Sequence, residues 1–298
     1  MNTLERAKTV PVRVAEPAKG QNGINADDYR YLQEYVYKQS GIVLDHDKHY
    51  LIDARLGPIV RRAGIRDVAD LCNLLRGVGA SGAGPAAETI KRDVVNAITT
   101  NETFFFRELT QYDALRQKVI PALMQQRKDT RKLRFWSAAA STGQEAYSLA
   151  MLLLDLGIEG WNVQITGTDL NDVVLEKAKQ AKYMQIEVNR GLGTPHLLRY
   201  FTRIGQEWQL KDEVRRLVQF ETLDLRRNLS ARGPFDIIFC RNVLIYFDLD
   251  TKRRILSDLR KAIYKGGYLL LGGAETTINV DDQFRRVEMC GATLYQVV

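Results

Sequence analysis

The sequence predicts an α/β protein with a mainly parallel, doubly wound sheet, preceded by a small all-helical unit. Three observations lead to this prediction. Apolar residues recur only at helical spacing before residue 99, whereas short strand patterns alternate with helical ones after about residue 131. With 298 residues, of which 45% are hydrophobic and 27% charged, the chain is long enough for one large domain and a smaller one.

The N-terminal third is expected to hold a flexible tail and a helical domain. Residues 1–24 mix proline, glycine, small and charged residues, which is typical of a tail. A helical domain follows over 25–98, with a first helix begun near Asp27 and Asp28. Its later parts are expected as a helix over about 48–63, a glycine-rich loop over 78–85 and a helix over about 86–98.

The remaining sequence is expected to contain a linker and helix over 99–130 and the α/β domain over 131–298. Strands are expected at 133–138, 163–168, 235–240 and 268–271, and helices at 144–156, 173–181 and 250–264. Residues 293–298 predict an antiparallel edge strand. Residues from about 203 to 220 interrupt the alternation, which predicts an inserted hairpin and helix. The aromatic run Phe104–Phe106 is typical of core.

Composition excludes some classes of protein. No apolar run approaches the roughly 20 residues that cross a bilayer, and no secretory signal pattern begins the chain. We therefore expect a cytoplasmic protein, with a monomer as the simplest state. The three cysteines and three histidines have no metal-ligand spacing, so no metal is expected. The net charge of +7 suits nucleic acid, an anionic membrane or an acidic protein, or merely a solvated basic surface.

Polar side chains follow the predicted strands where ligands bind in doubly wound sheets. Residues 138–143 are small, and Glu145 in the first turn of the next helix is placed to contact a cationic group. Asp169 ends the next strand and suits two ribose hydroxyls, although it equally suits a helix cap. Asp224 is placed to accept from an adenine amino group, and Asn242 belongs to a polar pair at another strand end.

The phosphate-binding motifs of nucleotide proteins are absent. The sequence contains neither GxxxxGK[ST] nor the complete GxGxxG fingerprint at these loops. An adenosine ligand without pyrophosphate, such as S-adenosylmethionine, therefore fits better than NAD or ATP.

Several long stretches resemble the CheR-type chemotaxis receptor glutamate methyltransferases, in the same order along the chain. They are TTNETFFFRE at 99–108, FWSAAASTGQEAYS at 135–148, GTDL at 167–170, GPFDIIFCRNVLIYF at 233–247 and GGYLLLG at 266–272. The resemblance covers about residues 27–298. It implies a Rossmann-like class I fold for S-adenosylmethionine-dependent methyl transfer, with an N-terminal helical domain and a small inserted β-subdomain. It also implies esterification of receptor glutamates.

The resemblance also implies roles for individual residues. Asn101, Thr103 and Arg107 would hold the methionine end and the mouth of the site. Glu145 would contact the methionine amino group and Asp169 the ribose. The adenine and the nearby cofactor surface would be lined by Asp224, Leu225, Asn242 and Val243. For catalysis, Arg107 would orient the acceptor carboxylate and Tyr246 would line the transfer channel.

The acceptor side is expected to involve a basic helix face. Arg55, Arg61, Arg62 and Arg66 would face the acidic methylation helices of a receptor, whereas on a generic helix they would form a solvated surface. Nucleic acid is disfavoured because basic and aromatic residues are not interleaved. A non-catalytic cofactor-binding adaptor and a methyltransferase for another acceptor stay open.

Two stretches depart from the family pattern. Residues 202–210 are short and contain one glycine, where tether-dependent relatives have a glycine-rich extension, so we predict independence from a receptor C-terminal pentapeptide. Residues 272–275 read Gly-Gly-Ala-Glu where many members have a His-Ser-Glu-like run, which leaves the role of that loop open.

Overall fold

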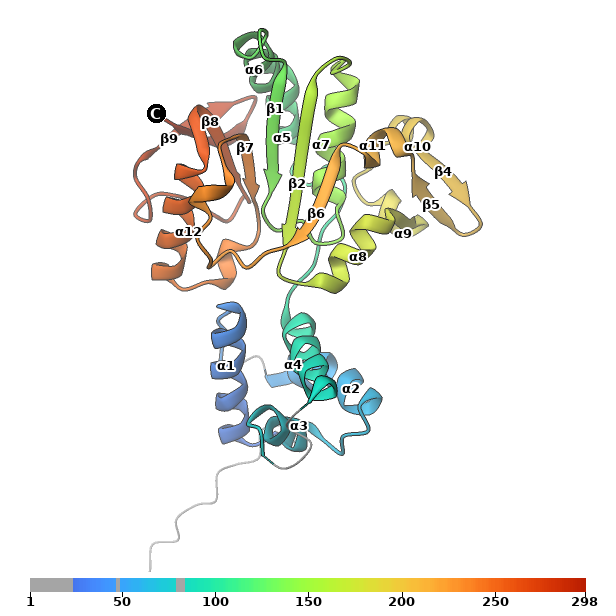
Figure 1. The fold of residues 1–298 in the computed structure, drawn as a ribbon, viewed down its shortest axis with the longest axis vertical. Helices are drawn as coiled ribbons and strands as arrows, with labels where there is room; N and C mark the ends of the chain where they lie inside the picture. Colours follow the sequence, from blue (N-terminus) through green and yellow to red (C-terminus); the bar gives the residue numbers. More distant parts are fainter. Residues whose placement is uncertain (1–23, 47–48, 79–83) are drawn as a thin grey trace, which may run out of the picture. The chain divides into compact units, whose positions relative to one another are not determined.

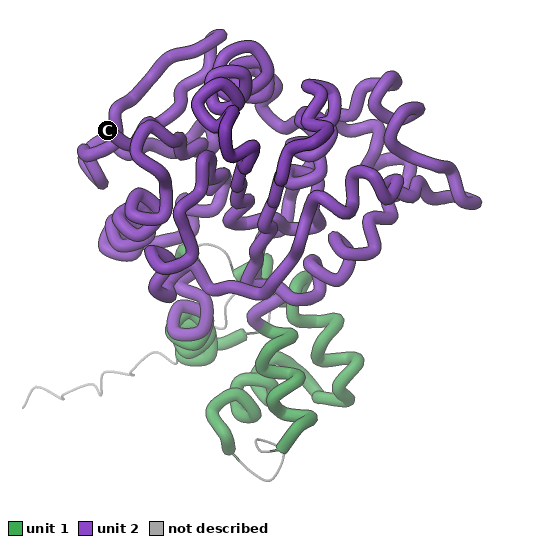
Figure 2. The backbone as a smooth tube through the Cα atoms, turned by 45° about the horizontal axis from the view of Figure 1, so that its top comes forward, with its two compact units in different colours: residues 1–35, 44–94 green, residues 36–43, 95–298 purple. Residues whose placement is uncertain are grey.

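A computed structural model of the chain describes residues 24–46, 49–78 and 84–298. The expected tail up to residue 23, residues 47 and 48, of which 48 begins the second expected helix, and residues 79–83 of the expected loop lie outside the described residues. The chain forms two compact units (Figure 2). Among the described residues, the smaller unit contains 24–35, 44–46, 49–78 and 84–94, and the larger contains 36–43 and 95–298. Residues 36–43 thus belong with the α/β part, unlike the predicted boundary.

The smaller unit is helical. Its helices are α1 (Ala26–Ser40, whose last turns belong to the larger unit), α2 (His49–Arg62), α3 (Val68–Leu75) and α4 (Pro85–Ile98). Asn25 caps α1, since its side chain accepts the Asp28 N–H at 2.8 Å, so the cap lies just before the predicted aspartates. The largely buried Asp28 carboxylate pairs with Arg76 at 2.8 Å, which compensates its charge.

The larger unit is built on a seven-stranded sheet in the order β6-β2-β1-β7-β8-β10-β9 (Figure 1). The strands are β1 (Lys132–Ser137), β2 (Asn162–Asp169), β6 (Val218–Thr222), β7 (Phe235–Cys240), β8 (Ile263–Leu271), β9 (Phe284–Met289) and β10 (Ala292–Val297). The first five in the sheet order are parallel, and β10 is antiparallel to both neighbours. The predicted doubly wound sheet is confirmed.

Helices cover both faces of this sheet (Figure 1). They are α5 (Leu109–Ala114), η2 (Leu115–Val119), α6 (Ile120–Gln126), α7 (Gln144–Asp155), α8 (Asp172–Gln180) and α12 (Leu249–Lys261), with short 3₁₀ turns η3 (Ser230–Arg232) and η4 (Leu244–Tyr246). Alternate residues of the buried strand β7 enter opposite cores, because successive side chains of a strand point to opposite faces. Ile237 and Phe239 join one core, and Ile238 and Cys240 the other.

Two sequence predictions about strands are wrong. The C-terminal strand β10 is antiparallel as predicted, but it lies between β8 and β9, and β9 forms the edge. The insertion was predicted at 203–220, but its small sheet begins already at residue 182. It ends before residue 218, because β6 at Val218–Thr222 belongs to the main sheet. Both missed strands, β6 and β9, are largely exposed and polar, so they lack the apolar run that indicates a buried strand.

The insertion itself is a three-stranded antiparallel sheet in the order β3-β5-β4. Its elements are β3 (Lys182–Met184), α9 (Gln185–Asn189), α10 (Thr194–Tyr200), β4 (Phe201–Ile204), β5 (Glu207–Leu210) and α11 (Asp212–Arg215). Strands β4 and β5 are joined by a two-residue turn at Gly205 and Gln206, where Gly205 has a φ of +62°.

Candidate cofactor site

A pocket lies in the larger unit at the carboxyl ends of β1, β2, β6 and β7, where doubly wound sheets bind ligands. Its empty space, including the part open to solvent, is about 900 Å³, which suits a small-molecule cofactor. All the residues predicted for cofactor binding or transfer line it, namely Asn101, Thr103, Arg107, Glu145, Asp169, Asp224, Leu225, Asn242, Val243 and Tyr246. The fold therefore brings these residues together, and their individual roles stay predictions.

Asp169 is the last residue of β2, and its carboxylate accepts backbone N–H groups of the neighbouring loops. It accepts the N–H of Ser141 at 2.9 Å and of Asn171 at 3.0 Å. Burial raises the pKa of this carboxyl, and the backbone hydrogen bonds oppose the rise. The alternative that Asp169 caps the next helix is wrong, because Asn171 caps α8 by accepting the N–H groups of Val173 and Val174.

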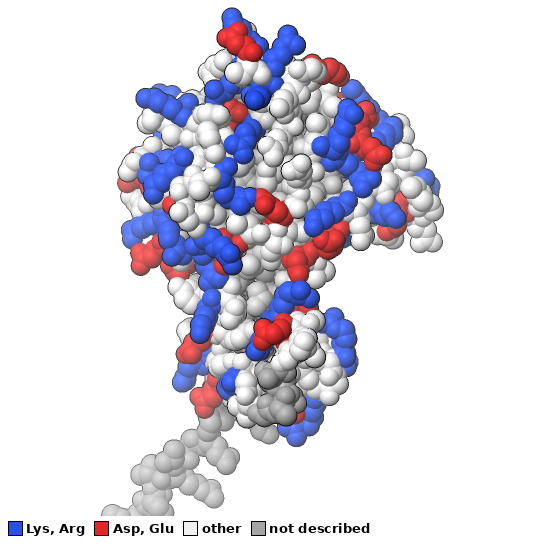
Figure 3. Space-filling view, in the orientation of Figure 1, with Lys and Arg blue, Asp and Glu red and all other residues white. Residues whose placement is uncertain are grey.

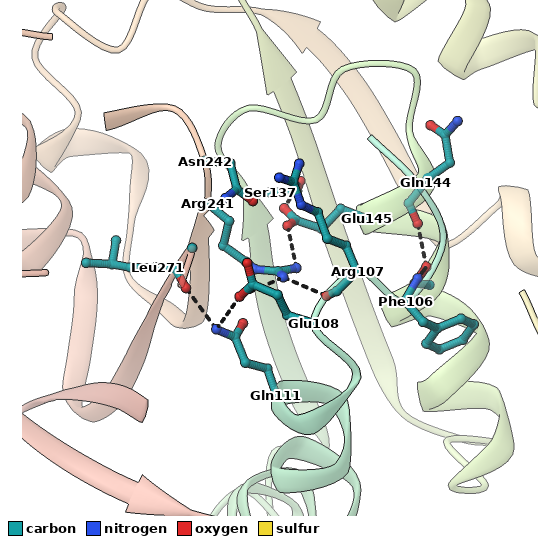
Figure 4. Close-up of polar contacts among 12 residues, drawn as sticks. Phe106, Arg107, Glu108, Gln111, Ser137, Gln144, Glu145, Arg241, Asn242 and Leu271 are labelled. Atoms are coloured by element: carbon teal, nitrogen blue, oxygen red, sulfur yellow. Dashed lines mark hydrogen bonds and ion pairs between the residues drawn. The ribbon is translucent and has the colours of Figure 1, made fainter. Parts of the chain in front are cut away.

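Glu145 in the first turn of α7 is held from two sides (Figure 4). It accepts the Ser137 hydroxyl at 2.7 Å and pairs with the Arg241 guanidinium at 3.1 Å. Burial raises the pKa of Glu145, while Arg241 and Ser137 oppose the rise. The sequence indicated Arg241 only as the partner of Asn242 in a polar pair at a strand end, and it predicted no role for Arg241.

Asp224 is engaged by a neighbouring arginine. The Arg226 guanidinium contacts both its oxygens, with Nη2 at 2.6 Å and Nε at 3.0 Å. The same guanidinium donates to the backbone carbonyls of Tyr37, Lys38 and Gln39 in the last turns of α1. In this conformation Asp224 and Arg226 therefore tie the loop after β6 to α1, and the carboxylate's predicted contact with adenine competes with the ion pair.

Glu275 anchors the loop that contains Asn242 and Val243. Its carboxylate accepts four backbone N–H groups, from Asn242 at 2.7 Å, Gly272 at 2.8 Å, Val243 at 2.9 Å and Ile245 at 3.3 Å. Burial raises the pKa of Glu275, and these hydrogen bonds oppose the rise. The 272–275 loop, whose role the sequence left open, thus positions the pocket wall through Glu275. Sequence reasoning missed this because the partners lie about 30 residues apart.

The segment over 99–108 forms another wall of the pocket. The Asn101 carbonyl accepts the Ser141 hydroxyl at 2.8 Å, and Arg107 donates to the Glu102 carbonyl at 3.1 Å. Phe104 was predicted to be core, but it is only half-buried and lines the pocket. The guanidinium groups of Arg190 and Arg107 lie 4.5 and 5.5 Å from its ring centre.

Backbone strain gathers at this site. Phe106, Glu108, Ser141 and Asn242 all have φ between +49° and +61°, which costs free energy for a residue with a Cβ atom. Each lies in a pocket wall or directly beside a lining residue. Such strain is typical of functional sites, where the surrounding structure holds unfavourable conformations in place.

The predicted acceptor-binding arginines lie outside the pocket lining, in the smaller unit. Arg62 pairs with Asp93 at 2.5 Å, and Arg66 pairs with Asp67 and Asp70 at 3.1 and 3.0 Å. Arg55 is half-buried and Arg61 is exposed. Two of the four charges are therefore already compensated by aspartates.

Charge is mixed across the molecular surface. On the face shown in Figure 3, Lys and Arg are interspersed with Asp and Glu over the larger unit and form no single band. That face therefore lacks the continuous basic track of a nucleic-acid site. Within the described ranges, no group of three or more His, Cys, Asp or Glu residues can hold a metal ion. Among the helices described, none has the length and apolarity to cross a membrane.

Comparison with known proteins identifies the family of the chain. Residues 101–292 match the family model "CheR methyltransferase, SAM binding domain", and residues 27–80 match "CheR methyltransferase, all-alpha domain". Chemotaxis protein methyltransferase 1 of Pseudomonas aeruginosa is 36% identical over 275 residues, which cover 90% of this chain and 97% of that protein. The chemotaxis protein methyltransferase of Vibrio parahaemolyticus is 35% identical over 280 residues, which cover 92% and 98%.

The family models account for both units. Their SAM-binding domain contains most of the residues that line the pocket and all but one of the strands in the main sheet, and the second model falls on the helical unit. The predicted fold class, family resemblance and cofactor are confirmed. The chain therefore belongs to the CheR methyltransferase family and is an S-adenosylmethionine-dependent methyltransferase.

Proposed function

We propose that this enzyme methylates glutamate side chains on the cytoplasmic methylation helices of chemoreceptors, acting in the cytoplasm as a monomer. The names of its relatives, which are chemotaxis protein methyltransferases, support a chemoreceptor acceptor. The chemistry of the pocket supports a carboxylate as the accepting group.

The observation that carries this proposal is the lack of an available base among the residues that line the pocket. No His, Lys or Cys is among them. Of the four lining carboxylates, Glu102, Asp224 and Glu145 pair with arginines, and Asp169 accepts two backbone N–H groups. Amine and alcohol acceptors have to lose a proton, whereas a glutamate with an ordinary pKa of about 4.3 is already ionised at pH 7.

S-adenosylmethionine supplies the methyl group on a sulfonium, so that a carboxylate oxygen forms the new C–O bond while the C–S electron pair stays on sulfur. No proton has to move, and the products are an ester and a thioether. The protein's task is then to align the acceptor and to exclude water. Arg107 suits the alignment, because it lines the pocket and its guanidinium makes one hydrogen bond among the described residues, to the Glu102 carbonyl.

The lining residues fit the chemical groups of S-adenosylmethionine. Glu145 provides a carboxylate for the methionine ammonium, and Asn101 and Thr103 provide polar contacts nearby. Asp169 is a half-buried acceptor for ribose hydroxyls, and Leu225 and Val243 provide apolar surface for adenine. We propose these contacts, with Tyr246 beside the path of the acceptor.

On the acceptor side, we propose that the arginines of the helical unit attract acidic helices. Arg61 is the strongest candidate, because it is exposed and no ion pair is found for it among the described residues. Arg62 and Arg66 would exchange their aspartate partners for acceptor carboxylates, and Arg55 would support them from a half-buried position.

We also propose that the enzyme does not need a receptor C-terminal pentapeptide. The two-residue turn between β4 and β5 leaves no room there for a glycine-rich extension. A peptide with a receptor's C-terminal pentapeptide should give no heat in calorimetric titration, and removing the pentapeptide from a receptor should leave its rate of methylation unchanged. Strong binding of the peptide would refute this part of the proposal.

Methyl transfer from radiolabelled S-adenosylmethionine to receptor cytoplasmic fragments tests the acceptor. Methyl esters release volatile methanol in mild alkali, whereas methylated amines do not, so the released label identifies the bond. We expect alkali-labile label that disappears when the acceptor glutamates are changed to alanine. Alkali-stable label would refute a carboxylate acceptor.

Calorimetric titration with S-adenosylhomocysteine tests the cofactor contacts separately. Asp169→Ala should weaken binding at least tenfold relative to wild type, because it removes a charged acceptor for two hydroxyls. Cofactor binding without methylation of any receptor fragment would favour the adaptor alternative.

A further inference from the structure

Arg241 lines the pocket and joins two of its walls (Figure 4). Its side chain is 1% exposed. Nη1 lies 3.1 Å from the Glu145 carboxylate of α7, and Nη2 lies 3.3 Å from the Glu108 carboxylate. Nη2 also donates to the Arg107 carbonyl at 2.6 Å. One buried cation thus contacts both the carboxylate of the cofactor wall and the turn that carries Arg107.

Tyr112 and Cys240 lie beside this cluster and supply no charge, and Arg107 contacts it through its backbone carbonyl. Burial raises the pKa of Tyr112, whose ring centre lies 6.0 Å from the Arg241 guanidinium carbon, and holds the pKa of the Cys240 thiol well above its usual range. Both groups are therefore neutral at pH 7. Arg241 faces Glu145 and Glu108 together, so this buried cluster is one positive charge short of neutral. A cationic group of a ligand at Glu145 would restore the balance.

Structural stability alone does not explain this arrangement. A buried guanidinium carries a large desolvation penalty, and apolar residues of similar volume often stabilise a core better. Arg241 Nε is buried without a hydrogen-bond partner among the described residues. The adjoining residues Asn242 and Glu108 have left-handed backbone conformations. Features that cost free energy and converge on one pocket indicate a functional role.

We propose that Arg241 is a positioning residue: it keeps Glu145 ionised and aimed at the α-ammonium group of the cofactor, and it fixes the turn that carries Arg107. This inference rests on the cofactor contact proposed above for Glu145. Glu145 is buried, and burial favours the neutral carboxylic acid. Arg241 provides the charge that opposes this effect, so its loss makes cofactor binding depend on pH.

The test measures the affinity for S-adenosylhomocysteine from pH 4.5 to 7.5 by calorimetry. Each protein should lose affinity towards acid pH as Glu145 becomes protonated, and the pH of this acid limb reports the pKa of Glu145. Arg241→Gln should move the acid limb to higher pH by at least about one unit. At a pH within the limb, this variant should then bind S-adenosylhomocysteine about tenfold more weakly than wild type. Arg241→Lys retains the charge and should keep the limb near that of wild type.

Two further variants make the outcome specific. Adding Glu145→Gln to Arg241→Gln should abolish the shifted limb, because the titrating group is gone. Glu108→Gln leaves Arg241 with one carboxylate and removes the repulsion that Glu108 exerts on Glu145, so the limb should move to lower pH. Glu108→Gln also provides a test if Arg241→Gln fails to give a cooperative melting transition.

Some results would overturn the proposal. They are an Arg241→Gln protein that melts cooperatively and keeps the wild-type acid limb, or a Glu108→Gln limb that does not move. A failure of the underlying contact looks different, because Glu145→Gln alone would then bind S-adenosylhomocysteine as tightly as wild type. No methyl transfer is measured, so the identity of the acceptor does not affect these outcomes.

Discussion

The carboxylate of Glu275 holds the loop after β7, which forms one wall of the pocket, and replacing one of its oxygens should weaken that hold. Oε2 accepts the N–H groups of Asn242 and Gly272, and Oε1 accepts those of Val243 and Ile245. Glu275→Gln replaces one oxygen by an NH₂ group of nearly the same size. The two hydrogen bonds accepted by the replaced oxygen are then lost, and the new NH₂ group faces two backbone N–H groups that are also donors.

The size of the effect follows from these contacts. A hydrogen bond to a charged group contributes about 1.5–3 kcal/mol, so two lost bonds amount to about 3–6 kcal/mol. Glu275 is only half-buried, and water can replace part of this loss. We expect Glu275→Gln to lower the free energy of unfolding by about 2–4 kcal/mol. Binding of S-adenosylhomocysteine should weaken as well, because Asn242 and Val243 line the pocket.

Urea unfolding followed by circular dichroism measures the stability, and calorimetry measures the binding. Glu176→Gln is the matched control, because Glu176 is exposed on α8 and pairs with Lys179 across one helical turn. This control should stay within about 0.5 kcal/mol of wild type. If both variants unfold at the same urea concentration and bind equally, the four hydrogen bonds do not anchor the loop and the reasoning is refuted.

Three further predictions concern stability. Gly191→Ala should melt at least several degrees lower than wild type, because the new Cβ atom would lie 1.9 Å from the Phe105 carbonyl oxygen and residue 191 has a φ of +84°. Gly193→Ala is the control and should keep the wild-type melting temperature, because the atom nearest to its new Cβ lies 3.7 Å away. Arg226→Met should lower the free energy of unfolding in urea by about 2–4 kcal/mol, because Asp224 loses its ion pair and three α1 carbonyls lose their guanidinium donor. The exposed Arg227→Met should stay near wild type. The pKa of Asp169 is raised in the folded state above its ordinary value of about 3.9, so the folded protein binds more protons at this group than the unfolded chain does. The contribution of this group to stability is therefore lost as pH rises through the folded pKa. The melting temperature of Asp169→Asn should therefore fall less with rising pH than that of wild type, and equal slopes would contradict the raised pKa.

The sequence located the pocket because one rule connects its parts. Side chains at the carboxyl ends of parallel strands meet at one edge of the sheet, so recognising the strands was enough to place Glu145, Asp169 and Asn242 together. Apolar runs such as the wholly buried β7 made those strands recognisable. The residue at which each strand begins was less important for this prediction than the residue at which it ends.

The parts that the sequence did not predict depend on contacts between distant residues or on exposed strands. β6 and β9 are largely exposed and have two or three apolar residues each, and the small β3-β5-β4 sheet consists of strands of three or four residues, so their alternation is too short to indicate a strand. The pairing of Arg241 with Glu108 and Glu145 spans three separate segments. Phe104 looked like its two buried neighbours in sequence, although its surroundings include two arginines.

The charges of the pocket explain how a basic protein can bind a cation. The chain has a net charge of +7, yet four acidic and two basic residues line the pocket. Glu102 and Asp224 are compensated by arginines outside the lining, Arg190 and Arg226. Asp169 has no ion pair among the described residues, and Arg241 has to compensate both Glu145 and Glu108. Even when Arg107, the second basic lining residue, is counted, Glu145, Asp169 and Glu108 exceed the two arginines by one negative charge, which favours a cationic ligand over a neutral one of the same shape. Methyl transfer removes the positive charge of the sulfonium, so the same electrostatics weaken the hold on the product.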